Sequence, residues 1–409
     1  MMPNASPSGP DTKSDIPKYL RPGKIGPLAL ANRLIRTATS ETMATERGDV
    51  TNELINLYST LARGGAGLLI TGHAYVEEVG QCSARQIGIY ADTLVPGLAR
   101  LTAAVHQNGG RIFCELSHAG SQSVMIDPIA PSIIENAIFE RQPREMSAAD
   151  IERIIAAFGQ AARRAAEAGF DGIHIHGGNG YLISQFNSPF SNRRSDQWGG
   201  DADRRSRFIL AVYDAIRAAV GPDMPITARY GLADSGPGQL QIDEGLARLR
   251  VLAGRGLNAV EPTYGLMTTY HENIRPYVAV TPARALQDWV LPRLWQPAHP
   301  EAYYLPFAKA VKAALDIPVI LVGGIRSTGQ MMRILRDGDA DFLAAARPFI
   351  REPDFPQSLK AGREGLLDCV SCNICLEHDG TDALKCWRKN ARDLAAHAYR
   401  HFLVSQTRS

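Results

Sequence analysis

Residues 170–208 read FDGIHIHGGNGYLISQFNSPFSNRRSDQWGGDADRRSRF, and this stretch decides the fold that we expect for the chain. It begins with a short apolar segment and breaks at a glycine pair, after which His176, Asn179 and Tyr181 are found within six positions. All three side chains can form hydrogen bonds, and two of them can carry protons. If the segment is a strand of a parallel barrel, these residues lie at its C-terminal end, where catalytic residues gather.

Seven further segments have the same short, mostly continuous apolar pattern, which is typical of parallel strands covered on both faces. The eight segments are 34–38, 67–71, 111–116, 172–176, 226–230, 258–261, 318–322 and 341–345. Helical patterns separate them, most clearly at 147–168 and 302–315. Eight such alternations predict a (β/α)8 TIM barrel. The competing arrangement is a doubly wound open sheet, but no G-x-G-x-x-G turn follows an early strand, so a dinucleotide-binding Rossmann domain is not supported.

The bulk composition narrows the class of protein. A length of 409 residues is enough for one large barrel or two average domains. The formal net charge of +2 gives no reason to expect nucleic acid or an acidic membrane surface as partner. No apolar run approaches the roughly 20 residues needed to cross a bilayer. We therefore expect a cytoplasmic protein with a flexible leader at 1–16, a barrel at 17–365, and a cysteine cluster with a C-terminal tail at 366–409.

Two connections are longer than the rest. Residues 119–146 follow the third predicted strand, and residues 262–301 follow the sixth. Loops of this size are usually functional or disordered, and because both leave C-terminal strand ends we expect them to be lids. The tail at 389–409 has a helical pattern and is expected to be peripheral.

The last two predicted strands end in residues suited to binding phosphate. Gly323 and Gly324 end the seventh strand, and Ala346 and Arg347 end the eighth. Glycines let backbone N–H groups approach an anion, and an arginine can bind it through two hydrogen bonds. The alternative is a glycine turn beside a surface arginine, but the loops after strands seven and eight form the recurrent phosphate site of this fold.

Six cysteines are unevenly distributed. Cys82 and Cys114 stand alone, whereas four are crowded into eighteen residues near the end: Cys369, Cys372, Cys375 and Cys386. In a cytosolic enzyme such a cluster indicates a metal site more than a disulfide framework. Four thiolates can hold a [4Fe–4S] cluster or tetrahedral zinc, and reduced free thiols are the third alternative.

Several motifs together resemble the old yellow enzyme family, whose members are flavin mononucleotide (FMN) barrels that reduce activated alkenes. Besides residues 170–208, the motifs are GGAGLLITG at 64–72, ELSHAG at 115–120, LVGGI at 321–325 and ADFLAAARPF at 340–349. The resemblance covers about residues 20–390. The motif SNRRSDQWGGD and the cysteine cluster are similar to the branch that contains bacterial 2,4-dienoyl-CoA reductase and trimethylamine dehydrogenase. The resemblance also implies that this protein forms a homo-oligomer, as is common in the family.

The resemblance assigns roles to the residues of the opening stretch. His176 and Asn179 match the pair that binds the carbonyl or other activating group of the substrate. Tyr181 matches the proton donor, and a phenol with a pKa of about 10 can protonate a carbanion while flavin N5 supplies hydride. His271, in the long second loop, matches a second catalytic group, although an exposed histidine there would be unremarkable. A tyrosine such as Tyr181 is otherwise more often a core residue.

The resemblance also assigns residues to the cofactor. Arg229 matches the cation beside flavin N1 and O2, and Gly72 matches a backbone contact. The segment below the isoalloxazine corresponds to Ala38, Thr39 and Ser40. Glu115 stands where many members of the family have glutamine. Because a carboxylate only accepts hydrogen bonds, we expect it to bind flavin N3–H, to repel O2 and to make the reduction potential more negative.

Two other histidines are interpreted as structural. We expect His174 to point away from His176 and to pack or to form a hydrogen bond within the core. We expect His118, in the HAG turn, to bond to a loop carbonyl. Within the similar branch, the cysteine cluster passes electrons from a second, FAD- and pyridine-nucleotide-binding module. The usual spacing there has three residues between the second and third cysteines, whereas this chain has two. We find no second module in these 409 residues, so a cluster here would need an external donor or redox partner protein, or would be structural.

These observations favour an FMN-dependent oxidoreductase that reduces an alkene conjugated to a carbonyl or thioester, with NAD(P)H as reductant and a small molecule as substrate. One alternative is oxidation of an N-methylated amine, for which the aromatic residues Tyr264, Tyr270, Tyr277 and Trp289 could form a cage. Another is a non-enzymatic flavin or iron–sulfur subunit of a larger electron-transfer complex. The combination of His176 with Tyr181 argues against a site without catalysis.

Overall fold

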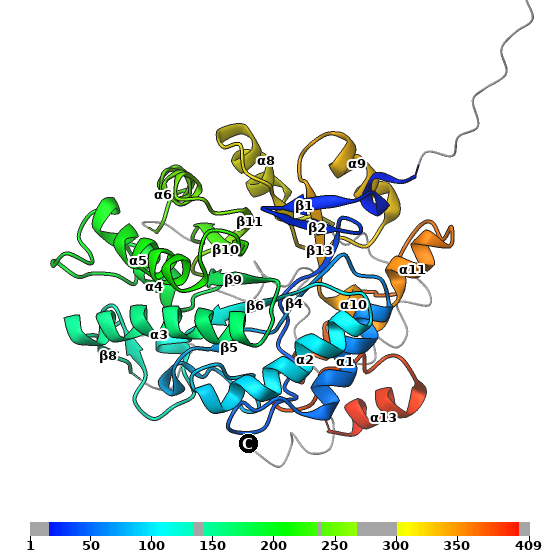
Figure 1. Cartoon of the computed structure of the whole chain (residues 1–409), viewed down its shortest axis with the longest axis horizontal. Helices are drawn as coiled ribbons and strands as arrows, with labels where there is room; N and C mark the ends of the chain where they lie inside the picture. Colours follow the sequence, from blue (N-terminus) through cyan, green and yellow to red (C-terminus); the bar gives the residue numbers. More distant parts are fainter. Residues whose placement is uncertain (1–15, 135–141, 236–238, 268–300, 401–409) are drawn as a thin grey trace, which may run out of the picture.

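Eight parallel strands form a closed barrel, one for each predicted segment. The structure, a computed structural model, describes residues 16–134, 142–235, 239–267 and 301–400. The barrel strands are β3 (Leu34–Arg36), β4 (Leu68–Ile70), β6 (Ile112–Ser117), β9 (Gly172–Gly177), β10 (Ile226–Ala233), β11 (Ala259–Tyr264), β12 (Ile320–Leu321) and β13 (Phe342–Ala345). A parallel bridge between Val260 and Val319 closes the sheet between β11 and the segment that leads into β12. The predicted (β/α)8 architecture is confirmed, and Figure 1 shows the helices arranged around the strands.

Helices alternate with the barrel strands and cover their outer side. They are α1 (Asn52–Arg63), α2 (Val95–Gln107), α3 (Ala148–Glu167), α4 (Leu182–Asn187), α5 (Ala202–Val220), α6 (Ile242–Gly254), α8 (Leu305–Ala314), α9 (Thr328–Arg336), α10 (Arg347–Arg351) and α11 (Phe355–Lys360). The C-terminal extension adds the short α12 (Ile374–Glu377) and α13 (Ala391–Tyr399), the latter within the tail that was predicted to be helical. Short strands β5 (Ala74–Tyr75), β7 (Ile129–Ala130) and β8 (Arg144–Glu145) lie in the loops.

The two helices predicted most clearly are present. Ser147 caps α3 by accepting from the N–H of Asp150 at 3.2 Å, and the Asp150 carboxylate accepts from the N–H of Ser147 at 2.9 Å. This reciprocal pair is a capping box, which satisfies two backbone donors at the helix start. Helix α8 begins at Leu305, three residues later than predicted, with a proline in its first turn, where a missing N–H costs nothing.

The lower half of the barrel interior, at the N-terminal strand ends, is apolar. Side chains alternate between the interior and the helix-covered side of each strand. The inward positions form a buried cluster that is distinct from the larger one under the helices: Ile35, Leu68, Ile70, Phe113, Ala259, Ile320, Phe342 and Ala344. An antiparallel hairpin of β1 (Gly23–Ile25) and β2 (Leu28–Leu30) adds Ile25 and Leu30 to this cluster. The hairpin therefore plugs this end of the barrel with apolar side chains.

The upper half of the interior, toward the C-terminal strand ends, is polar. On β6 the inward position after Phe113 is Glu115, and on β11 the inward position after Ala259 is Glu261. The parallel register sets Glu115 beside His174, and Arg229 beside both His176 and Glu261. Because neighbouring strands pair in this register, the charged side chains lie at the same height in the barrel. They form one layer at the base of the cavity described next.

The first barrel strand carries a buried arginine that the apolar pattern does not explain. Arg36 is 2% exposed and donates to the carbonyl of Ile70 at 2.6 Å and to the Tyr58 hydroxyl at 3.0 Å. Its guanidinium also lies 3.3 Å from Glu41, which accepts from the Tyr58 hydroxyl. Buried charges are tolerated when they are paired and hydrogen-bonded, and this network ties β3 to α1 and β4.

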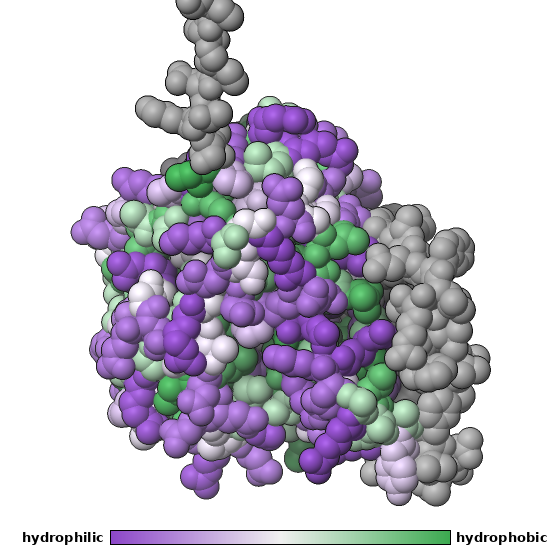
Figure 2. Space-filling model, turned by 90° about the vertical axis from the view of Figure 1, so that its right-hand side faces the viewer, coloured by the Kyte–Doolittle hydropathy of each residue, from purple (hydrophilic) through white to green (hydrophobic). Residues whose placement is uncertain are grey.

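The long second loop falls largely outside the description, since residues 268–300, including His271, are not among the described residues. The first long connection contains β7 and β8, which pair with each other, and its role as a lid remains a prediction. Among the described residues no helix is long and apolar enough to cross a membrane. Figure 2 shows hydrophilic side chains over much of one face, with hydrophobic ones scattered between them.

Candidate active site

A cavity of about 890 Å³ opens at the C-terminal ends of the barrel strands. This volume is within the range of pockets that bind cofactors and small molecules. Residues predicted for the site from four different strand ends line it together: Ala38, Thr39, Ser40, His176, Asn179, Tyr181, Arg229, Ala346 and Arg347. The barrel topology brings these residues together, although they are up to about 300 positions apart in the sequence.

His176 lines the cavity and has one ring nitrogen without a partner among the described residues. Its Nδ1 lies 2.9 Å from Oε1 of Glu115, and both side chains are buried, at 3% and 0% exposure. Burial alone would raise the pKa of Glu115, but His176 and Arg229 outweigh it and hold this pKa well below its usual value. The carboxylate is therefore ionised, and the Nδ1 of His176 carries the proton that it donates. The other ring nitrogen, Nε2, has no hydrogen-bond partner among the described residues.

His174 does not point away from His176, and that expectation was wrong. The two residues are separated by two positions, and side chains repeat their direction every second residue along a strand. The Nε2 of His174 lies 3.8 Å from Glu115, and its Nδ1 lies 2.8 Å from the Thr227 hydroxyl. Burial lowers the pKa of His174 to about 4, so it is a neutral, hydrogen-bonded core residue, as expected in that respect.

Arg229 lies between two buried carboxylates. Its Nε donates to Glu261 Oε1 at 2.7 Å, and its Nη1 lies 4.0 Å from Glu115. Its Nη2 donates to the Thr37 hydroxyl at 2.7 Å. Burial lowers the pKa of Arg229, but the two carboxylates raise it further than burial lowers it. The arginine is consequently a fixed cation whose side chain lines the cavity.

The glycine-rich turn after β9 positions Asn179 and Tyr181. Asn179 has φ of +59° and Gly180 has φ of +79°, the left-handed region in which asparagine and glycine are tolerated. A Cβ on Gly178 would lie 2.6 Å from the Thr263 side chain, so only glycine fits there. The Asn179 Oδ1 accepts from the Thr263 hydroxyl at 3.3 Å, which leaves the amide nitrogen as the group that can donate into the cavity.

Tyr181 contacts two residues that the sequence did not indicate. Its ring packs edge-on against the His176 ring, with centroids 4.3 Å apart, and near the His73 ring at 5.4 Å. Its hydroxyl lies 3.0 Å from the thiol of Cys82. Enclosure raises the pKa of Tyr181 well above 10, so the phenol is protonated at neutral pH. Cys82 and His73 follow the second barrel strand without any motif, so no sequence signal pointed to them.

The glycines predicted to bind phosphate line a small pocket of about 50 Å³ beside the cavity. Gly323 has φ of +113° and Gly324 has φ of +79°, so the turn depends on glycine. Arg326, Arg347 and Ser371 line the same pocket. Two cations and a hydroxyl around a glycine turn are suited to a phosphate group.

Two residues predicted to contact the cofactor lie behind the cavity wall. The N–H of Gly72 donates to Glu41 Oε1 at 2.7 Å, so this donor is already used. Glu115 is fully buried and borders His176 and Arg229, both of which line the cavity. Its second oxygen, Oε2, has no hydrogen-bond partner among the described residues. His118 is structural as expected, but its Nδ1 accepts from the N–H of Gly120 at 3.0 Å rather than bonding to a carbonyl.

The C-terminal extension forms one wall of the cavity, which the sequence did not predict. Leu376, Asp379 and Leu384 all line it. The extension is fixed to the barrel because the N–H of Leu384 donates to the carbonyl of Glu41 at 2.9 Å and that of Gly380 to the Thr42 hydroxyl at 3.1 Å. Segments far apart in the chain therefore share one cavity.

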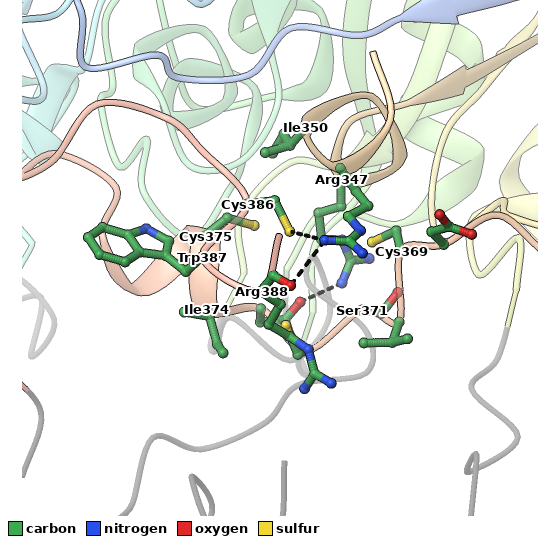
Figure 3. A pocket seen from close by; sticks show the side chains of 14 residues that line it. Arg347, Ile350, Cys369, Ser371, Ile374, Cys375, Cys386, Trp387 and Arg388 are labelled. Carbon is green, nitrogen blue, oxygen red and sulfur yellow. Dashed lines mark hydrogen bonds between the residues drawn. The ribbon is translucent and has the colours of Figure 1, made fainter. Parts of the chain in front are cut away.

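The four clustered cysteines line a separate pocket of about 140 Å³ next to the cavity (Figure 3). Cys375 and Arg347 line both spaces. No group of three or more His, Cys, Asp or Glu side chains in the described ranges is arranged to hold a metal ion. Arg351 donates to the sulfur of Cys386 at 3.9 Å, and burial raises the pKa of the Cys375 thiol. The cluster or zinc site therefore stays a prediction.

The chain is similar to known flavin enzymes. The model of the NADH:flavin oxidoreductase / NADH oxidase family matches residues 18–365. The NADH oxidase of Thermoanaerobacter brockii is 36% identical over 366 residues, covering 88% of this chain and 53% of that protein. The multifunctional alkene reductase/demethylase OYE of Caballeronia cordobensis is 32% identical over 373 residues, covering 89% and 52%. The chain thus spans about half the length of these two relatives. The structure of morphinone reductase in complex with tetrahydroNAD superposes with a TM-score of 0.68 at 27% identity, covering 87% of this chain and 94% of that one.

Proposed function

The chain belongs to the NADH:flavin oxidoreductase / NADH oxidase family, the family of old yellow enzyme, and we propose that it uses FMN to reduce an alkene conjugated to a carbonyl or thioester. The observation that carries the proposal is the buried, unpartnered Nε2 of His176, a residue that lines the cavity together with the phenol of Tyr181. A buried polar atom without a partner is costly unless a ligand supplies one. NAD(P)H is the proposed reductant.

The residues of the cavity fit FMN. The proposed phosphate site is the pocket of Gly323, Gly324 and Arg347, where positive φ values favour glycine and an arginine supplies positive charge. Arg229 would lie against the pyrimidine edge, and residues 38–40 would form the surface below the ring. When bound, FMN supplies the hydride that reduces the alkene. The chain's own residues bind, orient and protonate the substrate.

His176 and Asn179 are proposed to hold the carbonyl oxygen. The ionised Glu115 accepts the hydrogen bond from Nδ1 of His176. When the ring carries a second proton, on Nε2, this nitrogen can donate to the carbonyl oxygen of the substrate. The amide nitrogen of Asn179 is the second donor, because its oxygen is held by Thr263. Two donors at one oxygen stabilise the negative charge that develops when hydride adds to the alkene.

Tyr181 is proposed to protonate the neighbouring carbon. The phenol keeps its proton at neutral pH, since enclosure raises its pKa well above 10. It lines the same cavity as His176, with which its ring is in contact. A positioned acid of this kind contributes about 10²–10⁴-fold to a proton-transfer step.

The test uses the purified protein as isolated. We expect flavin absorbance, bleaching by anaerobic NADH or NADPH, and recovery of the absorbance when 2-cyclohexenone or a 2-enoyl-CoA is added. Tyr181→Phe should slow that recovery by about 10²–10⁴-fold while leaving the bleaching step within twofold. Tyr213→Phe, which removes a hydroxyl bonded to the carbonyl of Arg255 far from the cavity, is the matched control. Equal slowing of both steps by Tyr181→Phe, or no recovery with any conjugated alkene, would contradict the proposal.

A second candidate is oxidation of an N-methylated amine, and the acidic wall of the cavity favours it. The carboxylates of Asp379 and Glu46 line the cavity, and Asp379 is hydrogen-bonded to Ser40 and to the N–H of Gly380. A carboxylate in this place could hold an ammonium group. Anaerobic addition of dimethylglycine or trimethylamine would bleach the flavin in this case, and Asp379→Asn would raise the KM for the amine but not for an alkene.

Iron and zinc analysis of the same sample tests the cysteine site.

A further inference from the structure

Cys82 lies at the hydroxyl of Tyr181. The two atoms, Sγ and Oη, are 3.0 Å apart, which is a short contact for a hydrogen bond that involves sulfur. Both side chains line the cavity. Cys82 follows the 3₁₀ turn η2 (Glu78–Gly80), and Tyr181 immediately precedes α4, so the contact joins residues 99 positions apart.

Independent contacts hold each partner in place. The N–H of Cys82 donates to Gln86 Oε1 at 2.8 Å. The amide nitrogen of Gln86 in turn lies 2.7 Å from both Nδ1 and the carbonyl oxygen of His73. On the other side, the Tyr181 ring is packed against the rings of His176 and His73. The thiol and the phenol are thus fixed from separate elements, and neither depends on the other to be placed.

We propose that Cys82 is a positioning residue for Tyr181 that donates its S–H hydrogen bond to Oη as the phenol gives up its proton. The proposal rests on the proposed function of Tyr181 as the proton donor. In the step, the O–H bond of Tyr181 breaks, a C–H bond forms at the substrate carbanion, and the negative charge moves to the phenolate oxygen. Cys82 keeps its proton throughout, and the phenolate regains a proton from water after the product leaves.

The electrostatics of the site make such a donor useful. Burial raises the pKa of Tyr181, and Cys82 raises it further as long as its sulfur accepts the hydrogen bond. The negative charges of Asp379 and Glu115 add to this, so the phenolate is disfavoured unless the thiol donates to it. Burial raises the pKa of Cys82 to about 11, so the thiol is protonated at neutral pH and can donate. Burial lowers the pKa of His73 to about 4, so this ring is neutral, and it packs against Tyr181 as the His176 ring does. The thiol of Cys82 is therefore the group that donates a hydrogen bond to the phenolate oxygen of Tyr181 as its negative charge forms.

The first experiment measures the two half-reactions of the holoenzyme separately by stopped flow. Cys82→Ala should slow reoxidation by a conjugated alkene by about tenfold, because a hydrogen bond to a charged group is lost. Reduction by NADH or NADPH, which requires no proton from Tyr181, should stay within twofold. Cys82→Ser, which keeps a donor, should restore most of the rate. Cys114→Ala removes a buried thiol from β6 outside the cavity and is the matched control.

A double-mutant cycle separates positioning from a general structural effect. In the Tyr181→Phe background the hydrogen bond no longer exists, so Cys82→Ala should have no further effect on alkene reoxidation. Additive effects of the two substitutions, or equal slowing of both half-reactions by Cys82→Ala, would overturn the proposal.

The second experiment does not depend on turnover. Alkylation of Cys82 by iodoacetamide is followed by mass spectrometry as a function of pH in the wild-type protein and in Tyr181→Phe. The phenol hydrogen bond lowers the thiol pKa, so its removal should move the alkylation midpoint to higher pH. Coinciding midpoints would contradict the hydrogen bond. If no alkene reoxidises the wild-type protein, the proposed function fails, whereas this measurement still decides whether the Cys82–Tyr181 hydrogen bond exists.

Discussion

The lower and upper halves of the barrel interior are built from opposite kinds of side chain. The lower half holds Leu68, Phe113 and Phe342 in an apolar cluster plugged by the N-terminal hairpin. The upper half holds the buried carboxylate of Glu115 and the partly buried guanidinium of Arg229, which lines the cavity. Burying apolar surface stabilises a protein by about 25 cal/mol per Å², whereas each buried ion costs several kcal/mol before it is paired. The comparison indicates that the lower half provides stability and that the upper half provides oriented charge at some expense of stability.

The largest effect should follow from removing the cation of the upper half. Arg229→Met would leave Glu115 and Glu261, each 0% exposed, without their shared partner. Breaking a buried ion pair in this way costs about 3–5 kcal/mol. We expect a loss of this size in the free energy of unfolding measured with urea, together with weaker FMN binding.

The matched substitution in the lower half is Leu68→Ala. It should lower the free energy of unfolding by a similar amount, about 2–5 kcal/mol, because it leaves a cavity in a packed core. FMN binding and the KM for substrate should be unchanged in the fraction that folds. If Leu68→Ala weakens FMN binding as strongly as Arg229→Met does, the division between the two halves is wrong.

An intermediate effect is expected from acid. Burial lowers the pKa of His174 to about 4 and that of His118 to about 3. Between the ordinary value near 6.5 and these values, the unfolded chain binds protons that the folded chain does not. Stability should therefore fall as the pH falls through this window, by about 1.4 kcal/mol per pH unit for each histidine. The low pKa of Glu115 adds a loss in the same direction below about pH 4.5.

Urea unfolding between pH 7.5 and 5 measures this slope. His118→Asn can still accept from the N–H of Gly120 and should make the slope shallower. Leu68→Ala should lower the whole curve without changing its slope, since the cluster around Leu68 contains no titratable group. A slope that is the same in His118→Asn as in the wild-type protein would show that the histidine is charged in the folded state.

The smallest effect concerns the charge of Glu115. A buried carboxylate near the flavin should disfavour the anionic reduced form, so Glu115→Gln should raise the reduction potential. The expected rise is on the order of 30 mV, which corresponds to about 1.4 kcal/mol for a two-electron couple. Equilibrium titration against a reference dye measures it. A potential in the wild-type protein that is no lower than in Glu115→Gln would contradict the role of the charge.

The sequence predicted the barrel because its information is local. Each strand is a short apolar run, and eight of them in alternation with helical patterns leave few alternatives. The grouping of His176, Asn179 and Tyr181 could also be predicted, since these residues lie within one turn. The direction of His174 was misjudged, although the two-residue spacing from His176 contained the answer.

The sequence by itself thus determined the eight strands, the glycine turn at 177–180 and the residues that project from it. The tertiary structure alone decided which distant groups meet them: Glu115 behind His176, Cys82 at the hydroxyl of Tyr181, and Asp379 in the wall contributed by the C-terminal extension. The physical reason is that backbone patterns depend on near neighbours, whereas the pKa and the hydrogen-bond partner of a side chain depend on whatever the closed barrel brings within a few ångströms.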